Sequence, residues 1–251
     1  MKTDAAMVEV ESVSKSYASA DGAVRALDPV SFSARDGEFI SIIGPSGCGK
    51  STLLKIIGDL IGPSQGSVTV AGHSNHIARQ EGMFSFVFQN PVLLPWRRVI
   101  DNVRLPLEVL GRQSRDPRQL LAMVGLSGFE DRYPKELSGG MQQRVALARA
   151  LTFDPKVLLM DEPFGAVDEF TRAALNKQLL EIWQKIRVTV LLVTHSISEA
   201  VFLSDRVIVL SSRPGRVKEV LEVPFLRPRE AALQETEPFQ EVVKFLRAKL
   251  E

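Results

Sequence analysis

The sequence has a single cysteine, no long apolar run and no secretory signal. Cys48 is the only cysteine among 251 residues, which excludes an intramolecular disulfide framework. No apolar run approaches the roughly 20 residues that a spanning helix needs, so any membrane role should be peripheral. The first ten residues lack the apolar core and the small-residue cleavage site of a secretory signal, and we therefore expect a cytoplasmic protein.

The sequence also lacks an excess of charge of either sign. Lys and Arg number 31 against 30 Asp and Glu, which gives a formal net charge of +1. A protein without a strong net field is not drawn as a whole to nucleic acid or to anionic lipid. We therefore expect no nucleic-acid partner, and we expect partners to be recognised by local surfaces. A chain of this length buries enough surface to form a large core without disulfides or structural metals.

Strand patterns dominate the first third of the chain. Residues 30–34 and 38–43 flank an Asp36-Gly37 pair, and Asp-Gly between two apolar runs is a strong hairpin signal. A glycine-rich turn follows, and the apolar spacing of residues 51–57 then predicts a buried helix. The local order is therefore strand, loop, helix.

Helix formers replace strand formers between residues 91 and 155, which we interpret as a helical insert. Strand patterns return at residues 157–160, 189–193 and 206–210, separated by an amphipathic helix over residues 171–186. This alternation predicts an α/β fold with a mainly parallel sheet and right-handed crossovers.

The turn after the strand at residues 39–43 matches the phosphate-loop pattern G-x-x-x-x-G-K-[ST]. Glycines in such a turn let successive backbone N–H groups converge on phosphate oxygens at a helix N-terminus. Lys50 is expected to reach the β- and γ-phosphates of ATP, and Ser51 to hold Mg²⁺. The alternative, a simple glycine turn, does not explain the strand-to-helix junction. The predicted nucleotide-binding residues here are Gly44, Pro45, Ser46, Gly47, Cys48, Gly49, Lys50, Ser51 and Thr52.

Two carboxylates close the buried strand pattern at residues 157–160. Asp161 is expected to support Mg²⁺, and Glu162 to polarise the attacking water. Taken alone, this run would be interpreted as an acidic strand end at the surface. Beside a phosphate loop, the catalytic interpretation is favoured.

Between these two motifs, residues 137–144 read LSGGMQQR and resemble the signature sequence of the ABC ATPase family. Other motifs of that family follow in its order. Gln89 resembles the Q-loop, residues 165–168 resemble the D-loop, and His195 resembles the switch histidine. Tyr17 stands where the family has its adenine-stacking aromatic residue. The resemblance extends from about residue 8 to residue 223.

The resemblance implies the roles of these residues. Gln89 would be a ligand of Mg²⁺ and a member of the catalytic set with Glu162, and His195 would contact the γ-phosphate. Two copies would close face to face over two ATP molecules, so the expected assembly is a homodimer. Each copy would complete the other's site with its signature residues and D-loop, here Ser138, Gly139, Gly140 and Asp168.

A physical reading of the signature agrees with this role. Ser138 is a good N-cap and the two glycines after it expose the backbone, so such a helix end binds anions. Ser-Gly-Gly before a helix is, without the other motifs, more often only a capped turn. Two positions depart from the usual family pattern: Met141 replaces Gln and Val167 replaces Leu.

The resemblance also implies the domain organisation. The expected fold is that of a P-loop NTPase, with a RecA-like mainly parallel sheet, an N-terminal antiparallel β subdomain and an inserted α-helical subdomain. We expect one domain over residues 1–251. Its predicted parts are a nucleotide-binding core at 1–90 and 156–225, a helical subdomain at 91–155 and a C-terminal helical tail at 226–251.

Residues 89–103 stand where transporter ATPases of this family receive a helix of the membrane subunit. Leu93, Leu94 and Trp96 are expected to form an apolar groove, and Arg97 to add charge, the mix found at interface hot spots. The alternative is the core of the helical insert with a basic edge. The run LLPWR followed by V-x-x-N-V resembles the importer branch for nitrate, sulfonates and taurine.

An importer subunit implies further partners. These are a separate transmembrane permease and, indirectly, a periplasmic-type solute-binding protein, with the chain lying on the inner face of the cell membrane. The competing function is a soluble or exporter-associated ABC ATPase that is not coupled to import. The sequence has neither a second nucleotide domain nor a long coiled-coil insertion, so transport is preferred.

Overall fold

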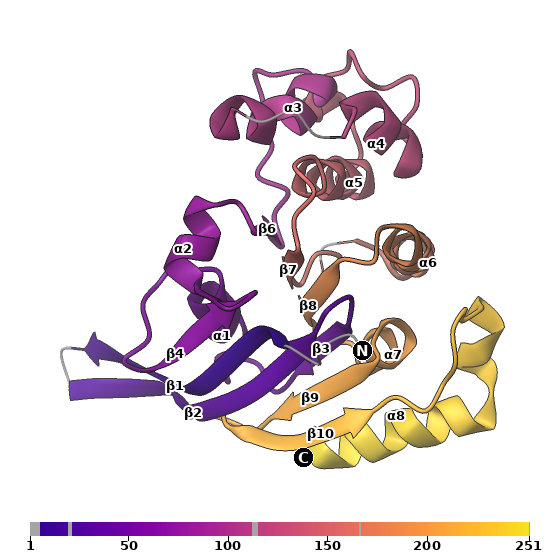
Figure 1. The fold of residues 1–251 in the computed structure, drawn as a ribbon. Helices are drawn as coiled ribbons and strands as arrows, with labels where there is room; N and C mark the ends of the chain where they lie inside the picture. The colour runs from indigo at the N-terminus through magenta and orange to yellow at the C-terminus, as the bar shows by residue number, and fades with distance from the viewer. Residues whose placement is uncertain (1–5, 20–21, 112–114, 166, 251) are drawn as a thin grey trace, which may run out of the picture. The chain divides into compact units, whose positions relative to one another are not determined.

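The computed structural model describes residues 6–19, 22–111, 115–165 and 167–250. The chain divides into two compact units (Figure 1). We call Met1–Glu81 with Thr189–Glu251 the core unit, and Gly82–Val188 the helical unit. The domain boundaries expected from the sequence stay a prediction.

One sheet of the core unit is antiparallel. Its strand order is β2-β1-β4-β5. Val10 pairs with Phe32 on one side and with Val68 on the other, so the buried valines of β1 line one face of the sheet. This sheet is the antiparallel β subdomain expected near the N-terminus. The strands are β1 (Ala6–Ser19), β2 (Gly22–Arg35), β4 (Gln65–Val70) and β5 (His73–Ser74).

The other strands of the core unit are β3 (Phe39–Ile43), β8 (Thr189–Val193), β9 (Arg206–Leu210) and β10 (Val217–Glu222). β3 pairs in parallel with β8 and with β9, and β10 is antiparallel to β9. Every residue of β3 and β8 is buried, as expected for parallel strands that are covered on both faces. The helices α1 (Lys50–Ile57) and α7 (Ile197–Leu203) pack on these strands.

The predicted hairpin around Asp36-Gly37 is wrong. A turn does form there, because Glu38 N donates to Arg35 O at 3.2 Å, and Gly37 has a φ of 67°. However, β2 belongs to the antiparallel sheet and β3 pairs with β8 and β9. Since β3 is buried at every position, it needs cover on both faces, which pairing in the parallel sheet provides.

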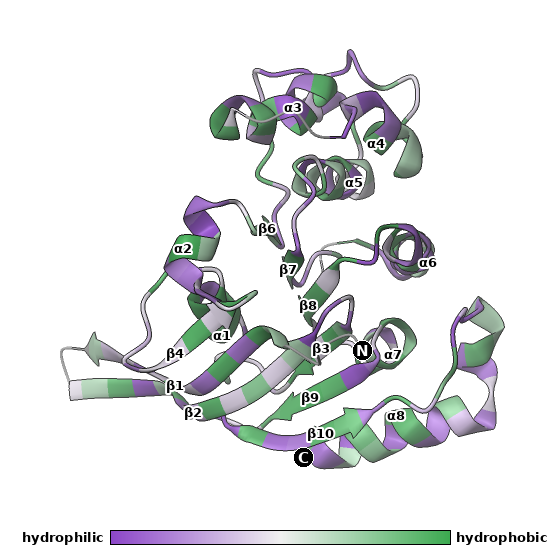
Figure 2. Cartoon of the chain, in the orientation of Figure 1, coloured by the Kyte–Doolittle hydropathy of each residue, from purple (hydrophilic) through white to green (hydrophobic). Residues whose placement is uncertain are grey.

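Three further helical segments complete the core unit: α2 (Asn75–Gln80), η2 (Ala231–Glu235) and α8 (Glu237–Leu250). α8 contacts α7 and β9, and it buries Phe239, Val243 and Leu246. Figure 2 shows the two-sided character of α8 beside β9, which is apolar after its first residue, Arg206. The amphipathic pattern therefore corresponds to a helix docked by one face.

The helical unit contains the parallel pair β6 (Phe84–Val87) and β7 (Val157–Asp161). α5 contacts α3, α4, α6 and β6, and it is the central element of this unit. The described part of the predicted insert contains helices and no named strand, as expected. The helices are α3 (Val99–Leu110), α4 (Pro117–Met123), η1 (Pro134–Glu136), α5 (Gly139–Ala150) and α6 (Glu169–Ile186).

In the described part of the chain, none of the helices combines the length and the apolar character needed to cross a bilayer.

Candidate functional site

The phosphate loop joins β3 to α1 in the core unit. Gly49 is the N-cap residue of α1 and has a φ of 102°. A Cβ at this position would lie 2.6 Å from Leu27 Cδ2 and 2.9 Å from Ala26 O, so only glycine fits. Gly47 has a φ of 74°, and a Cβ there would meet nothing within 4 Å. The loop is therefore packed tightly at Gly49 and open at Gly47.

Lys50 lies across the inside of this loop. Its side chain is only 6% exposed, and Nζ donates to Gly44 O at 2.8 Å and to Pro45 O at 3.0 Å. A buried ammonium in such a position would interact strongly with a phosphate that enters the loop. Ser51 and Thr52 follow in the first turn of α1 and are half-buried. The exposed Ser46 lies on the rim.

Cys48 is fully buried at the base of the loop. Burial raises the pKa of its thiol above the usual value, although the charge of Lys50 opposes this shift. A Cβ at Gly44 would lie 2.7 Å from Cys48 Sγ, so the thiol fills the space that glycine leaves. Cys48 is therefore a neutral packing residue in this structure.

The loop residues fit a phosphate chain. Gly49 holds the backbone close, and the loop is open at Gly47. The Lys50 ammonium and the N-terminus of the eight-residue α1 both place positive charge at the loop, which favours the binding of a phosphate anion. The donors are chemically suited to phosphate oxygens, and the hydroxyl of Ser51 is suited to Mg²⁺.

The two predicted carboxylates lie in the helical unit. Asp161 ends β7 and is 9% exposed. Glu162 has a φ of +45°, a left-handed conformation that non-glycine residues rarely adopt. Such strained backbone is concentrated at functional sites. The conformation breaks the alternation of the strand, so the two carboxylates are not constrained to opposite faces.

Gln89 and Glu162 converge on Gly165. A Cβ at Gly165 would lie 3.4 Å from Glu162 Oε2 and 3.5 Å from Gln89 Nε2. The sequence placed Gly165 only within the D-loop pattern and gave it no separate function. The structure places both polar groups within ordinary van der Waals distance of a Cβ at this position. The predicted catalytic carboxylate and the predicted Q-loop amide are thus brought together within one unit.

Two side chains of α5 hold the segment that begins at Gln89. Gln143 Nε2 donates to Gln89 O at 2.5 Å. Arg149 donates to Pro91 O at 2.7 Å and to Val92 O at 2.8 Å. The sequence reasoning gave neither side chain a role. The only available signal was that Gln143 lies in the signature. Hydrogen bonds between residues this far apart in the sequence cannot be predicted from the spacing of residues.

The predicted N-cap at the signature is confirmed. Ser138 Oγ accepts from Met141 N at 3.3 Å, and α5 begins at Gly139. The two glycines meet different surroundings. A Cβ at Gly140 would lie 2.9 Å from Thr171 Cγ2, whereas a Cβ at Gly139 would meet nothing within 4 Å. Gly140 thus allows helix packing, and Gly139 leaves the helix end accessible.

The D-loop is described only in part. Ala166, the second residue of the predicted motif, lies outside the described residues. Asp168 is the N-cap of α6 and accepts from Thr171 N at 2.9 Å. Hydrogen bonds from Thr171 lower the pKa of the Asp168 carboxyl below its usual value. Asp168 therefore carries a negative charge at neutral pH.

His195 and Tyr17 both belong to the core unit and are exposed. His195 lies in the short connection between β8 and α7. Tyr17 is on β1 and is 40% exposed, with the ammonium of Lys15 5.3 Å from its ring centroid. The stacking of this ring on adenine stays a prediction.

The predicted docking residues lie in the helical unit. Trp96 is 71% exposed, Leu93 and Leu94 are half-buried, and Arg97 pairs with Glu108 at 2.7 Å. Trp96 therefore offers a large apolar surface at the start of the helix bundle.

A buried asparagine organises this predicted docking segment. Asn102 is fully buried; its Oδ1 accepts from Leu94 N at 2.7 Å, and its Nδ2 donates to the carbonyls of Leu94, Arg97 and Arg98, each at 3.1 Å. The V-x-x-N-V pattern was noted in the sequence only as a subfamily resemblance. Its asparagine serves to shape the segment.

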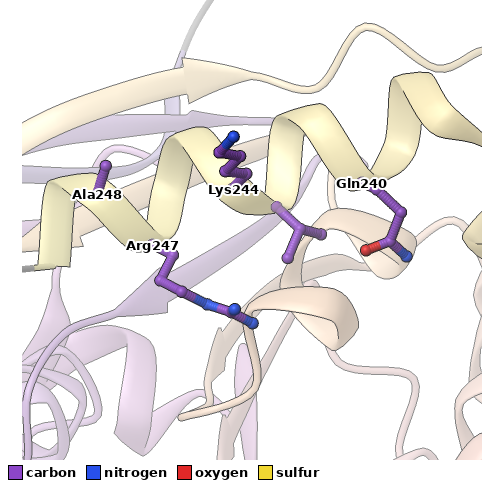
Figure 3. A pocket seen from close by; sticks show the side chains of 5 residues that line it. Gln240, Lys244, Arg247 and Ala248 are labelled. Atoms are coloured by element: carbon purple, nitrogen blue, oxygen red, sulfur yellow. The ribbon is translucent and has the colours of Figure 1, made fainter.

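A separate hollow lies beside α8 in the core unit (Figure 3). Gln240, Lys244 and Arg247 line it together with Val243 and Ala248. None of these residues was predicted as a site residue.

Three comparisons with known proteins bear on the site. The chain matches the family model described as ABC transporter over residues 27–165. The aliphatic sulfonates import ATP-binding protein SsuB of Bacillus cereus is 43% identical, covering 94% of this chain and 93% of the relative. The bicarbonate transport ATP-binding protein CmpD of Synechocystis is 42% identical, covering 90% of this chain and 82% of the relative.

A solved structure shows the same fold. It is the dimeric structure of a post-hydrolysis state of the ATP-binding cassette MJ0796 bound to ADP and Pi. The TM-score is 0.77 at 34% identity, with 88% of this chain and all of that chain covered. The expected P-loop NTPase fold is confirmed.

Proposed function

The chain belongs to the ABC transporter family, and from that premise we propose that it is the ATP-binding and ATP-hydrolysing subunit of an importer. The observation that carries this proposal is the glycine loop closing around Lys50 at the start of α1. Lys50 binds the β- and γ-phosphates there, in place of the two backbone carbonyls. Tyr17 stacks on the adenine ring.

The catalytic group of the helical unit is Glu162, which orients and polarises the attacking water. Its carboxylate lies beside the Gln89 amide at Gly165, so the two groups act on one point. Mg²⁺, when bound, neutralises charge on the phosphates; Ser51, Gln89 and Asp161 are its proposed ligands. His195 contacts the γ-phosphate from the core unit.

A second copy of the chain completes the site. The open N-terminus of α5, with Ser138 as N-cap and Gly139 accessible, is suited to the phosphates bound by the partner copy. Gly140 and Asp168 support this surface. The dimeric cassette with 34% identity supports the same assembly. The homodimer is therefore the hydrolytic form.

The importer assignment rests on the relatives. SsuB is named for import of aliphatic sulfonates and CmpD for transport of bicarbonate. We infer a small solute of this type, including nitrate and taurine, and a separate permease that docks near Leu93, Leu94, Trp96 and Arg97. A solute-binding protein delivers the solute, and the chain lies on the cytoplasmic face of the membrane.

Phosphate release from ATP tests the catalytic part of the proposal. The wild-type chain should release phosphate only with a divalent cation present. Glu162→Gln should keep ATP binding, measured by calorimetry, and should lose turnover by at least about 10²-fold, because it removes the group that polarises water. Unchanged turnover in that variant would refute the assignment.

Uptake tests the importer part. The chain should co-purify with a permease encoded beside it, and deletion should abolish uptake of one small solute from the sulfonate, taurine, nitrate or bicarbonate group. Copurification without a membrane partner, or an export phenotype, would favour the soluble or exporter-associated alternative.

A further inference from the structure

The loop that carries His195 is closed by a buried hydroxyl. β8 ends at Val193 and α7 begins at Ile197, so three residues form the connection. Thr194 is 2% exposed, and its Oγ1 accepts from Ser196 N at 3.0 Å. Its backbone N also donates to Ile42 O on β3 at 3.3 Å. The residues on both sides of His195 are therefore tied to each other and to the sheet.

The same hydroxyl donates to a buried carboxylate. Thr194 Oγ1 donates to Glu199 Oε2, and Glu199 is 6% exposed in the first turn of α7. Glu199 N in turn donates to Ser196 Oγ at 3.3 Å. A hydroxyl has one proton and accepts through its lone pairs. Because the proton points at the carboxylate, a lone pair faces the Ser196 N–H, and the loop has one preferred geometry.

The helix that carries Glu199 is held at its far end. Arg229 is 6% exposed, and its Nη1 donates to the carbonyls of Val201, Phe202 and Ser204 at 2.8–3.0 Å. Burial, together with the nearby Arg227, lowers the pKa of Arg229 to about 10, so the guanidinium stays charged at neutral pH. A cation at a helix C-terminus is favourable. α7 is thus fixed in place, and so is the Glu199 carboxylate.

We propose that Thr194 and Glu199 are positioning residues that hold the exposed imidazole of His195 in the orientation needed for its γ-phosphate contact. This inference rests on the proposed function, because it assigns the pair a task only through His195. Removing a carboxylate from water is costly unless it is hydrogen-bonded. An apolar residue would fill the same space at the start of α7, so packing alone does not explain Glu199.

Thr194→Val tests the proposal, because valine keeps the shape and removes the hydroxyl. We expect kcat for ATP to fall by about tenfold, as displacement of an active group does, with KM changed less than about twofold. Thr194→Ser should recover turnover, because it restores the hydroxyl. Ser198→Ala, which removes a hydrogen bond from α7 to Gln234, is the matched control and should leave kcat unchanged.

A double-variant cycle separates positioning from general stability. In a His195→Ala background, Thr194→Val should cause no further loss of kcat, because residues that act through one another are not additive. Glu199→Gln, which weakens the acceptor, should lower kcat in the same background-dependent way. If Thr194→Val does not fold, judged by its melting curve, Glu199→Gln takes its place.

Hydrogen exchange provides a readout without nucleotide. The Ser196 amide should exchange faster in Thr194→Val than in the wild type, and Thr194→Ser should restore its protection. An equal fold-loss of kcat with and without His195, or wild-type kcat in both Thr194→Val and Glu199→Gln, would overturn the proposal. Unchanged exchange would do so as well. Failure of the proposed function is distinct, since the wild type itself would then lack turnover.

Discussion

The side-chain amide of Gln143 donates a hydrogen bond of 2.5 Å to the backbone carbonyl of Gln89, which lies 54 residues earlier in the chain. Gln143 is 3% exposed and belongs to α5, the helix that begins beside Ser138. One buried donor therefore joins the proposed Mg²⁺-binding segment to the helix whose N-terminus is proposed to meet the second copy. A movement of α5 should therefore shift the backbone at Gln89.

Gln143→Ala should lower ATP turnover several-fold. The change removes the donor to Gln89 O, and the loss of this part-buried hydrogen bond costs about 0.5–1.5 kcal/mol of stability. Phosphate release and urea unfolding measure the two effects. Gln178→Ala is the control, since Gln178 Nε2 donates to Met123 O at 3.4 Å, away from Gln89. Equal turnover in both variants would contradict the link.

Gly49→Ala should destabilise the chain more than Gly72→Ala does. Both glycines have a left-handed φ, 102° and 80°, so each substitution incurs backbone strain of about 1–3 kcal/mol. Only at Gly49 does the new Cβ also collide with Leu27 Cδ2 and Ala26 O; at Gly72 it meets nothing within 4 Å. Denaturant unfolding measures the difference. ATP binding should be lost only in Gly49→Ala.

The thiol of Cys48 should resist alkylation at pH 8 in the folded protein and react at once in urea. Burial raises its pKa, so the folded state holds the proton more tightly than the unfolded state. The corresponding stability is present below the ordinary thiol pKa and is lost as the pH rises through the raised value. Reaction with a coloured disulfide reagent across pH 7–10 measures this. Rapid reaction at pH 8 would contradict the buried geometry.

Trp96→Ala should weaken capture of the permease by at least about tenfold while basal ATP turnover stays near that of the wild type. Truncation of an exposed tryptophan at an interface centre typically costs about 2 kcal/mol or more. Binding to the permease in detergent measures this. Phe245→Ala, at another exposed aromatic residue on α8, is the control and should bind normally. Equal capture by both variants would move the docking surface elsewhere.

The features that the sequence predicted well are local. The phosphate loop lies between β3 and α1 because its glycines allow the turn, and Ser138 caps α5 through a hydrogen bond three residues along the chain. The helix over 171–186 also follows local apolar spacing, and the structure extends it by two residues at its start. Such signals need no knowledge of distant partners.

The features that were missed depend on long-range pairing. The turn at Asp36-Gly37 forms as predicted. However, β2 joins the antiparallel sheet and β3 the parallel strands, because burial on one face or on both faces decides which sheet a strand joins. The hydrogen bonds of Gln143 and Arg149 to the segment after β6 likewise connect distant residues. From the sequence alone, polar residues in a helix pattern are interpreted as a solvent-exposed face. Only the packed structure shows that these side chains donate to distant backbone carbonyls.

Asn102 gives the proposed docking segment a property that matters for association kinetics. Its four hydrogen bonds to Leu94, Arg97 and Arg98 fix the backbone conformation around Trp96 when the chain folds, before any partner binds. A partner helix that binds there does not have to order the backbone of this segment, so that part of the entropic cost of complex formation is avoided. The surface is preorganised. A partner whose shape does not match it should dissociate quickly, because the segment does not change its conformation to fit.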